Sequence, residues 1–96
     1  KYVTLRFEWD EEKNQINQKK HKISFETAAY VFADKNYIEM YDFEHSTEED
    51  RYIAIGCVGE VLFVVFTERK ENIRLISARL ATESERRLYY DQNIYY

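Results

Sequence analysis

The stretch VLFVVFTERKENIRLISARLAT, residues 61–82, decides the fold that this sequence predicts. Its first part, Val61 to Phe66, is an unbroken apolar run rich in β-branched residues, typical of a strand covered on both faces. Its second part, Ile73 to Leu80, places arginines between apolar residues. The short polar link Lys70-Glu71 between the two parts predicts a β-hairpin with a two-residue turn.

This turn fixes which residues of the predicted hairpin face each other. It pairs Thr67 with Arg74, Val65 with Ile76 and Phe63 with Ala78. Because side chains alternate between the two faces of a strand, we expect Arg74 to share a face with Arg69, and Arg79 to point the other way. An arginine in a central strand usually has a carboxylate partner, a salt-bridged role at the rim of the sheet, or an anion to bind.

Length and composition indicate one domain over residues 1–96. The sequence has no proline and only two glycines, which argues against long flexible linkers. It contains no membrane-length apolar run and opens without a signal peptide, so a cytoplasmic protein is expected. The net charge of −4 equals the four acids of the loop 44–50, namely Glu44, Glu48, Glu49 and Asp50. The acidity is therefore local, and a basic surface elsewhere stays compatible with it.

The N-terminal half predicts one strand and two helices. Leu5 to Trp9 reads as a strand, and Asp10 caps a helix that runs to about His21. One face of this helix is polar and consists of Asp10, Lys13, Asn17, Lys20 and His21. This polar face is either solvated surface or the lining of a site. Ser24 caps a second helix, whose apolar stripe is Phe25, Ala28, Ala29 and Phe32.

The C-terminal half predicts four strands and a helix. Tyr37 to Phe43 and Arg51 to Val58 are the two strands before the hairpin, and Thr82-x-x-Glu85 is a capping box that opens the last helix. The order β-α-α-β-β-β-β-α favours an α+β domain. We expect a mostly antiparallel sheet with the two N-terminal helices on one face and a C-terminal helix. His45 in the acidic loop matches no metal-ligand spacing, so no metal site is predicted.

Several segments together resemble the BrnT family of bacterial toxins. They are FEWDEEKNQIN (residues 7–17), KHKISFETAAYVFAD (20–34), RYIAIG (51–56) and TERKENIRLISARLAT (67–82), followed by Glu85, Tyr89 and Tyr90. Lys22 departs from the family, which usually has glycine there, and this departure is expected to change the turn before Ser24 more than the chemistry.

The resemblance implies a RelE-like fold and a ribonuclease toxin of a type II toxin–antitoxin system that inhibits translation. It implies neutralisation by a cognate BrnA-like antitoxin, operator DNA bound only through that antitoxin, and a higher-order toxin–antitoxin complex. It implies no cofactor.

The residue types fit RNA cleavage without a metal ion. Attack of a 2′-hydroxyl on phosphorus needs a base, an acid and cations around the charged phosphorus, and arginine suits the last role. His21 is the natural proton carrier, with Lys20 or Glu26 as partner. The remaining catalytic candidates are Arg69, Arg74 and Arg79, and the substrate-binding candidates are Arg51, Lys13, Tyr89 and Tyr90.

Each candidate also has a structural interpretation. Arg74 and Arg79 fit ion pairs with Asp10, Glu8 or Glu26, Arg51 fits a salt bridge to the acidic loop, and the tyrosines fit core packing. Two other functions compete with the nuclease. One is a non-catalytic adaptor that binds a partner protein through Arg and Tyr anchors, and the other is an RNA binder without cleavage. Either role with RNA predicts that the acidic loop 44–50 lies away from the binding site.

Overall fold

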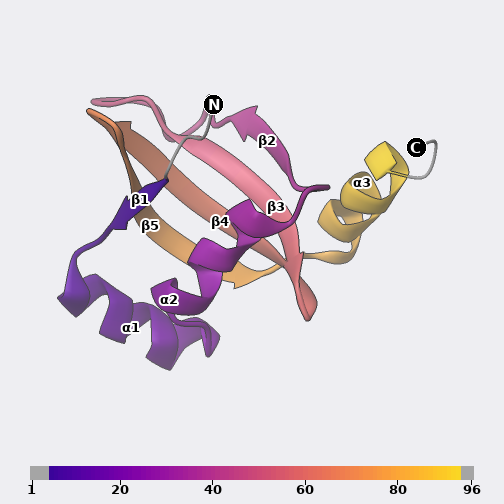
Figure 1. The fold of residues 1–96 in the computed structure, drawn as a ribbon, viewed down its shortest axis with the longest axis horizontal. Coiled ribbons are helices and arrows are strands. Elements are labelled where there is room, and N and C mark those ends of the chain that lie inside the picture. Colours follow the sequence, from indigo (N-terminus) through magenta and orange to yellow (C-terminus); the bar gives the residue numbers. More distant parts are fainter. Residues whose placement is uncertain (1–4, 94–96) are drawn as a thin grey trace.

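A computed structural model describes residues 5–93 and contains a five-stranded sheet with helices packed against it (Figure 1). The elements follow the chain as β1 (Arg6–Glu8), α1 (Glu11–His21), α2 (Phe25–Ala28), the 3₁₀ helix η1 (Ala29–Ala33), β2 (Ile38–Tyr41), β3 (Tyr52–Val58), β4 (Glu60–Arg69), β5 (Asn72–Leu80) and α3 (Glu83–Asn93). The predicted α+β class is confirmed. The second predicted helix is one α-helical turn that continues as η1.

The sheet is mixed, with strand order β1-β5-β4-β3-β2. Neighbouring strands from β2 to β5 pair antiparallel, whereas β1 pairs parallel with β5. This parallel pair corrects the expectation of a mostly antiparallel sheet. It forms because the helices carry the chain from β1 to β2 at the opposite edge of the sheet. The three antiparallel pairings from β2 to β5 then bring β5 beside β1, running in the same direction. Within residues 5–93, no helix is long and apolar enough to cross a membrane.

The β4–β5 hairpin confirms the predicted turn but not the whole predicted register. Arg69 pairs with Asn72 across Lys70-Glu71, and Thr67 pairs with Arg74 as predicted. The other two predicted pairs are wrong, since Val65 faces Ser77 and Phe63 faces Arg79. The cause is a β-bulge: one extra residue, Ile76, lies between the partners of Val65 and Phe66.

The bulge changes which arginines are neighbours. Arg74 lies opposite Thr67 and Arg79 lies opposite Phe63, and both partners are odd-numbered residues of β4. Odd-numbered β4 residues share one face of the sheet, and Arg69 belongs to the same set. The prediction that Arg79 points away from Arg74 is therefore wrong. All three arginines belong to the face opposite the main core.

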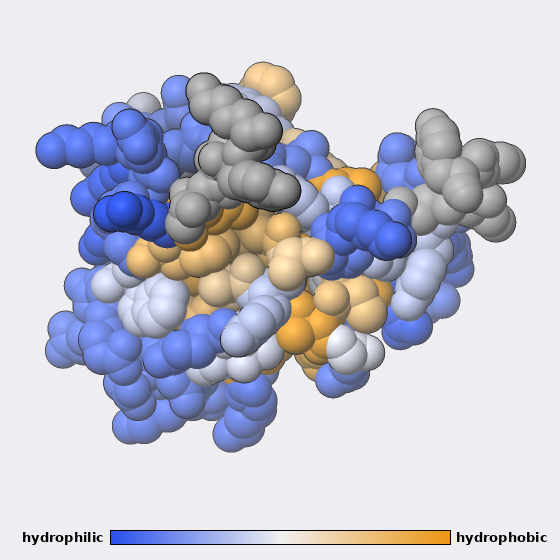
Figure 2. Space-filling view, viewed as in Figure 1, coloured by the Kyte–Doolittle hydropathy of each residue, from blue (hydrophilic) through white to orange (hydrophobic). Residues whose placement is uncertain are grey.

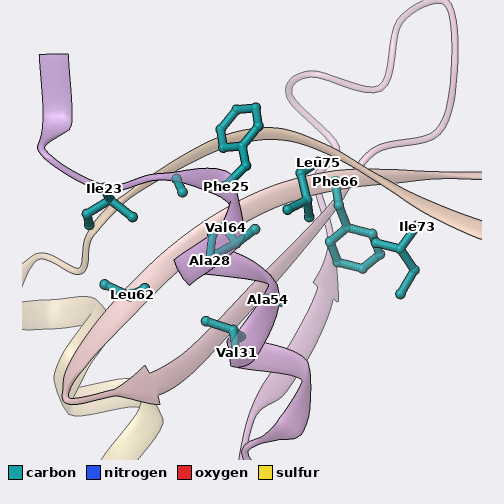
Figure 3. Close-up of a cluster of buried hydrophobic side chains, with 11 residues drawn as sticks. Ile23, Phe25, Ala28, Val31, Ala54, Leu62, Val64, Phe66, Ile73 and Leu75 are labelled. Carbon is teal, nitrogen blue, oxygen red and sulfur yellow. The ribbon is translucent and has the colours of Figure 1, made fainter. Parts of the chain in front are cut away.

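The main core lies between the sheet and the helices α2 and η1. Figure 3 shows Phe25, Ala28 and Val31 of the helices in one cluster with the sheet residues Val64 and Phe66. All five of these side chains are buried. A smaller cluster on the other face holds α3 through Tyr89, whose ring packs against Ile55 and Val61.

The predicted caps are present at the helix ends. The Asp10 carboxylate accepts hydrogen bonds from the backbone N–H groups of Glu12 and Lys13, and the Ser24 hydroxyl accepts one from Thr27. Thr82 and Glu85 form the predicted capping box. Lys22 caps the C-terminal end of helix α1 and takes the left-handed conformation with φ 64°. A left-handed residue at this position explains why glycine suits it, as the family resemblance indicated.

Candidate active site

Helix α1 is held in place by two buried asparagines rather than by apolar side chains: Asn17 binds the sheet and Asn14 binds α2. Asn17 Nδ2 donates to the carbonyl oxygens of Ile23 and Ala78, both at 2.8 Å, and its Oδ1 accepts from the Ala78 N–H at 3.2 Å. Asn14 Oδ1 accepts from the Phe25 N–H at 2.8 Å. Ile16, the only large aliphatic residue of α1, is 59% exposed. Strand β1 pairs only with residues 72–74 of β5, and farther along β5 the Asn17 amide makes the backbone hydrogen bonds that a neighbouring strand would make.

This docking brings three predicted site residues around one groove. Lys13, Lys20 and His21 of α1 line it together with Ile76 and Ser77 of β5, and its volume is about 200 Å³. The two lysines are exposed and His21 is half-buried. None of the three basic side chains has a carboxylate partner among the described residues. We call this feature the α1–β5 groove.

Arg74 and Arg79 lie on either side of Ser77 along β5, and each is paired with a carboxylate. Arg74 Nη1 donates to Glu8 Oε2 at 2.8 Å. Hydrogen bonds from Asn72 and then from Arg74 lower the pKa of Glu8 below its usual value. The expected structural ion pair of Arg74 with Glu8 is therefore present.

Arg79 is held more rigidly than Arg74. Its two terminal nitrogens donate to the two oxygens of Glu85 at 2.8 and 2.9 Å, and its guanidinium carbon lies 4.0 Å from the centre of the Phe63 ring. The hydrogen bonds from Arg79 lower the pKa of Glu85. A bidentate pair stacked on an aromatic ring fixes the plane of the guanidinium. The partner Glu85 is the capping-box residue, which was not among the partners expected for Arg79.

Arg51 and Arg69 lie beside the acidic loop. Arg69 Nη2 is 3.4 Å from Glu49 Oε1, and Arg51 Nη2 is 3.8 Å from Glu49 Oε2. The local salt bridge expected for Arg51 is thus present. Both arginines line a second groove of about 280 Å³ that also contains His45 and Glu48. The acidic loop was expected away from an RNA site, so its position here counts against RNA contacts by these two arginines and not against the α1–β5 groove.

The remaining candidates lie elsewhere on the molecule. Glu26 accepts a hydrogen bond from Asn14 and lines an apolar groove that shares no residue with the α1–β5 groove. Tyr89 is buried, and its hydroxyl donates to Asp34 Oδ2 at 2.6 Å. Tyr90 is half-exposed and packs edge-on against Tyr89. Within the part of the chain that the structure describes, no three His, Cys, Asp or Glu side chains form a group able to hold a metal ion.

Sequence reasoning missed Ser77 and the bulge at Ile76, which form the β5 side of the α1–β5 groove. The sequence analysis placed Asn17 on the polar face of α1 but did not predict that its side chain binds the backbone of β5. An asparagine on the polar face of a helix gives the same sequence pattern whether it is exposed or buried against a strand, so the sequence does not predict such a bond.

Comparison with known proteins identifies the family. A model of the family "Ribonuclease toxin, BrnT, of type II toxin-antitoxin system" matches residues 9–85. The structure is similar to the 1.1 Å crystal structure of the ribonuclease toxin BrnT of Brucella abortus, with a TM-score of 0.62 and 26% sequence identity over 83% of this chain and 100% of that one. A comparison with curated proteins gives no match. Because the family model covers most of its length, this chain belongs to the BrnT family of ribonuclease toxins of type II toxin–antitoxin systems.

Proposed function

We propose that this toxin cleaves RNA without a metal ion in the α1–β5 groove and thereby inhibits translation. The observation that carries the proposal is the meeting of Lys13, Lys20 and His21 beside the bulged edge of β5. Three basic side chains without carboxylate partners give a locally positive surface on a chain whose net charge is −4. Such a surface attracts RNA phosphates whatever the total charge.

The proposed reaction is an attack of the ribose 2′-hydroxyl on the adjacent phosphorus. The bond from the 2′-oxygen to phosphorus forms while the bond from phosphorus to the 5′-oxygen breaks. A base takes the 2′-hydroxyl proton and an acid donates a proton to the leaving 5′-oxygen, giving a 2′,3′-cyclic phosphate and a 5′-hydroxyl. His21 carries out one of these two proton transfers, with Lys20 beside it as the partner.

Arg79 and Arg74 stabilise the pentacoordinate phosphorus in this proposal. Both belong to the face of β5 that carries Ser77, which lines the groove. A phosphate offers the same two-oxygen geometry that Glu85 offers to Arg79, so the arginine can exchange one partner for the other. Prearranged positive charge of this kind contributes about 10²–10³ in rate per contact.

The other candidates have no part in the proposed centre. Arg51 and Arg69 share Glu49 as an ion-pair partner beside the acidic loop. Glu26 lines a different groove, and the ring of the buried Tyr89 has no surface for a base to stack on. Tyr90, half-exposed beside Arg86, stays a candidate for a contact outside the groove.

The proposal includes the partners of a type II system. A cognate BrnA-like antitoxin neutralises the toxin, operator DNA is bound only through that antitoxin, and toxin and antitoxin assemble into a higher-order complex in the cytoplasm. The competing function is a non-catalytic adaptor. It is favoured by the ion pairs of Arg74 and Arg79, which give both arginines a structural reason to be present.

The test compares the two histidines of the chain. The parent protein, His21→Ala and His45→Ala are incubated with end-labelled RNA in the presence of EDTA. We expect the parent to cleave, His21→Ala to lose about 10²–10⁴-fold in rate, and His45→Ala to match the parent. An RNA with a 2′-deoxyribose at the cut site should stay intact. Uncut RNA with a folded parent would favour the adaptor, and equal losses in the two variants would remove His21 from the mechanism.

A further inference from the structure

An apolar groove of about 730 Å³ lies between β1 and the helices α2 and η1. The residues that matter for the following argument are Phe7, Trp9, Ala29, Tyr30, Phe32 and Glu26. Figure 2 shows apolar side chains gathered on this face of the molecule and bordered by hydrophilic ones. We call this feature the β1–η1 groove.

The β1–η1 groove is unusually apolar for an exposed surface. At its rim, Tyr30 is 66% exposed and Leu5 is 47% exposed. It also adjoins β1, an edge strand of the described sheet. Apolar side chains beside an open sheet edge favour aggregation, and natural proteins cover such places with another segment.

The charges around the β1–η1 groove indicate which kind of partner can bind there. Of the described residues that line it, Glu26 alone carries a charge. Asn14 donates to Glu26 Oε1, and Oε2 has no hydrogen-bond partner within residues 5–93. A second acid lies at the Trp9 end, where Glu11 Oε1 accepts from the indole N–H at 3.1 Å. An apolar groove with one carboxylate in its lining and a second beside it disfavours RNA phosphates and suits an apolar segment that carries a lysine or arginine.

A second copy of this chain fits the groove poorly. Among the described residues, the most exposed large apolar side chain is Phe43, which is 85% exposed and lies between Asp42 and Glu44. Inserting Phe43 would bring these acids towards Glu26, and like charges at an interface are repulsive. These charges favour an occupant from a different protein.

We propose that the antitoxin of this system docks an apolar segment in the β1–η1 groove and pairs a basic side chain with Glu26. This inference rests on the proposed neutralisation by an antitoxin. The ring of Tyr30 and the indole of Trp9 are the aromatic anchors, the type of residue that dominates binding energy at interfaces. No residue of this groove lines the α1–β5 groove, so binding and RNA cleavage can be altered separately.

The test uses Tyr30→Glu, with Phe43→Glu as a matched control because both replace an exposed aromatic ring by an acid. The product of the gene next to the toxin gene is purified and titrated into each full-length toxin in a calorimeter. We expect Tyr30→Glu to weaken binding at least about tenfold and Phe43→Glu to change it less than twofold. Glu26→Gln should also weaken binding, and less so at high salt.

Three outcomes would overturn the inference. Parent-like affinity of Tyr30→Glu would remove the groove from the interface, while retained RNA cleavage by the parent would leave the nuclease proposal intact. No binding by the parent would also refute the antitoxin part of the proposed function. Concentration-dependent self-association of the toxin that Tyr30→Glu abolishes, measured by sedimentation, would assign the groove to a second copy instead.

Discussion

Replacing Asn17 by alanine tests how α1 is attached to the sheet. The side chain is buried and makes three hydrogen bonds to backbone groups, two to Ala78 and one to Ile23. Alanine keeps the helix but removes all three bonds. The Ala78 N–H and carbonyl then face the end of α1 without a partner, in a place that is fully buried.

The expected loss follows from the number of bonds. A protein hydrogen bond contributes about 0.5–1.5 kcal/mol net, so three give about 3 kcal/mol. The better helix propensity of alanine offsets about 0.6 kcal/mol of this loss in the free energy of unfolding. The free energy of unfolding should therefore fall by about 2–3 kcal/mol, a large part of the stability of a domain of this size.

Equilibrium urea unfolding, followed by the fluorescence of the single tryptophan Trp9, measures this change. Ile16→Ala is the matched control because Ile16 lies on the same helix and is 59% exposed. It should change the free energy of unfolding by less than about 0.5 kcal/mol.

A loss below about 1 kcal/mol in Asn17→Ala would refute the argument that amide-to-backbone bonds hold α1. Equal losses in the two variants would do so as well, because they would assign the attachment to apolar contacts of Ile16. If the argument holds, Asn17→Ala should also weaken RNA cleavage, since α1 carries three residues of the proposed centre.

Three further predictions concern two backbone positions and the hydrogen bond from Tyr89 to Asp34. Lys22→Gly should raise the free energy of unfolding by about 0.5–1 kcal/mol, because residue 22 has φ 64°, and thermal unfolding measures the gain. Gly56→Ala should lower it by about 1–3 kcal/mol, since a Cβ there would lie 2.8 Å from Val31 Cγ1, and an unchanged urea midpoint would contradict this contact. Tyr89→Phe should lower it by about 1–3 kcal/mol at pH 7 through the lost bond to Asp34. Burial raises the pKa of Asp34, but hydrogen bonds led by that of Tyr89 lower it more, so the net pKa is below the usual value and the stabilisation is present at neutral pH. The difference between parent and Tyr89→Phe should shrink as the pH falls below about 4, and a difference that grows there would reverse the assignment.

The local signals in the sequence predicted the fold well. The turn at Lys70-Glu71, the caps at Asp10 and Ser24 and the box Thr82-x-x-Glu85 all depend on neighbouring residues only, and the structure confirms each of them. The parallel pairing of β1 with β5 was not predicted, since it joins residues more than sixty positions apart.

The bulge at Ile76 shows where local reasoning stops. Regular alternation from Ile73 and Leu75 would place Ser77 and Arg79 on the core face, and the bulge places Ala78 there instead. No turn or cap signal in the sequence marks this bulge. The structure places Leu75 opposite Phe66 and Ala78 opposite Val64 in the core, which the regular register would not allow together. The face of the sheet on which Arg79 lies thus depends on the extra residue Ile76, and the packing of the core determines where this bulge forms. The β5 side of the candidate site could not be predicted for the same reason, because Ile76 and Ser77 line it.

For the proposed RNA cleavage, the distribution of ion pairs predicts the order in which the basic residues bind RNA. Each of Arg51, Arg69, Arg74 and Arg79 already has a carboxylate within 4 Å, so an RNA phosphate must displace that carboxylate to bind. The basic side chains of α1 have no such competitor among the described residues. RNA should therefore bind first to the basic side chains of α1. Arg79 should then release Glu85 and bind a phosphate. On this argument Lys13→Ala and Lys20→Ala weaken RNA binding and its salt dependence, whereas Arg79→Ala reduces the rate of cleavage more than the affinity.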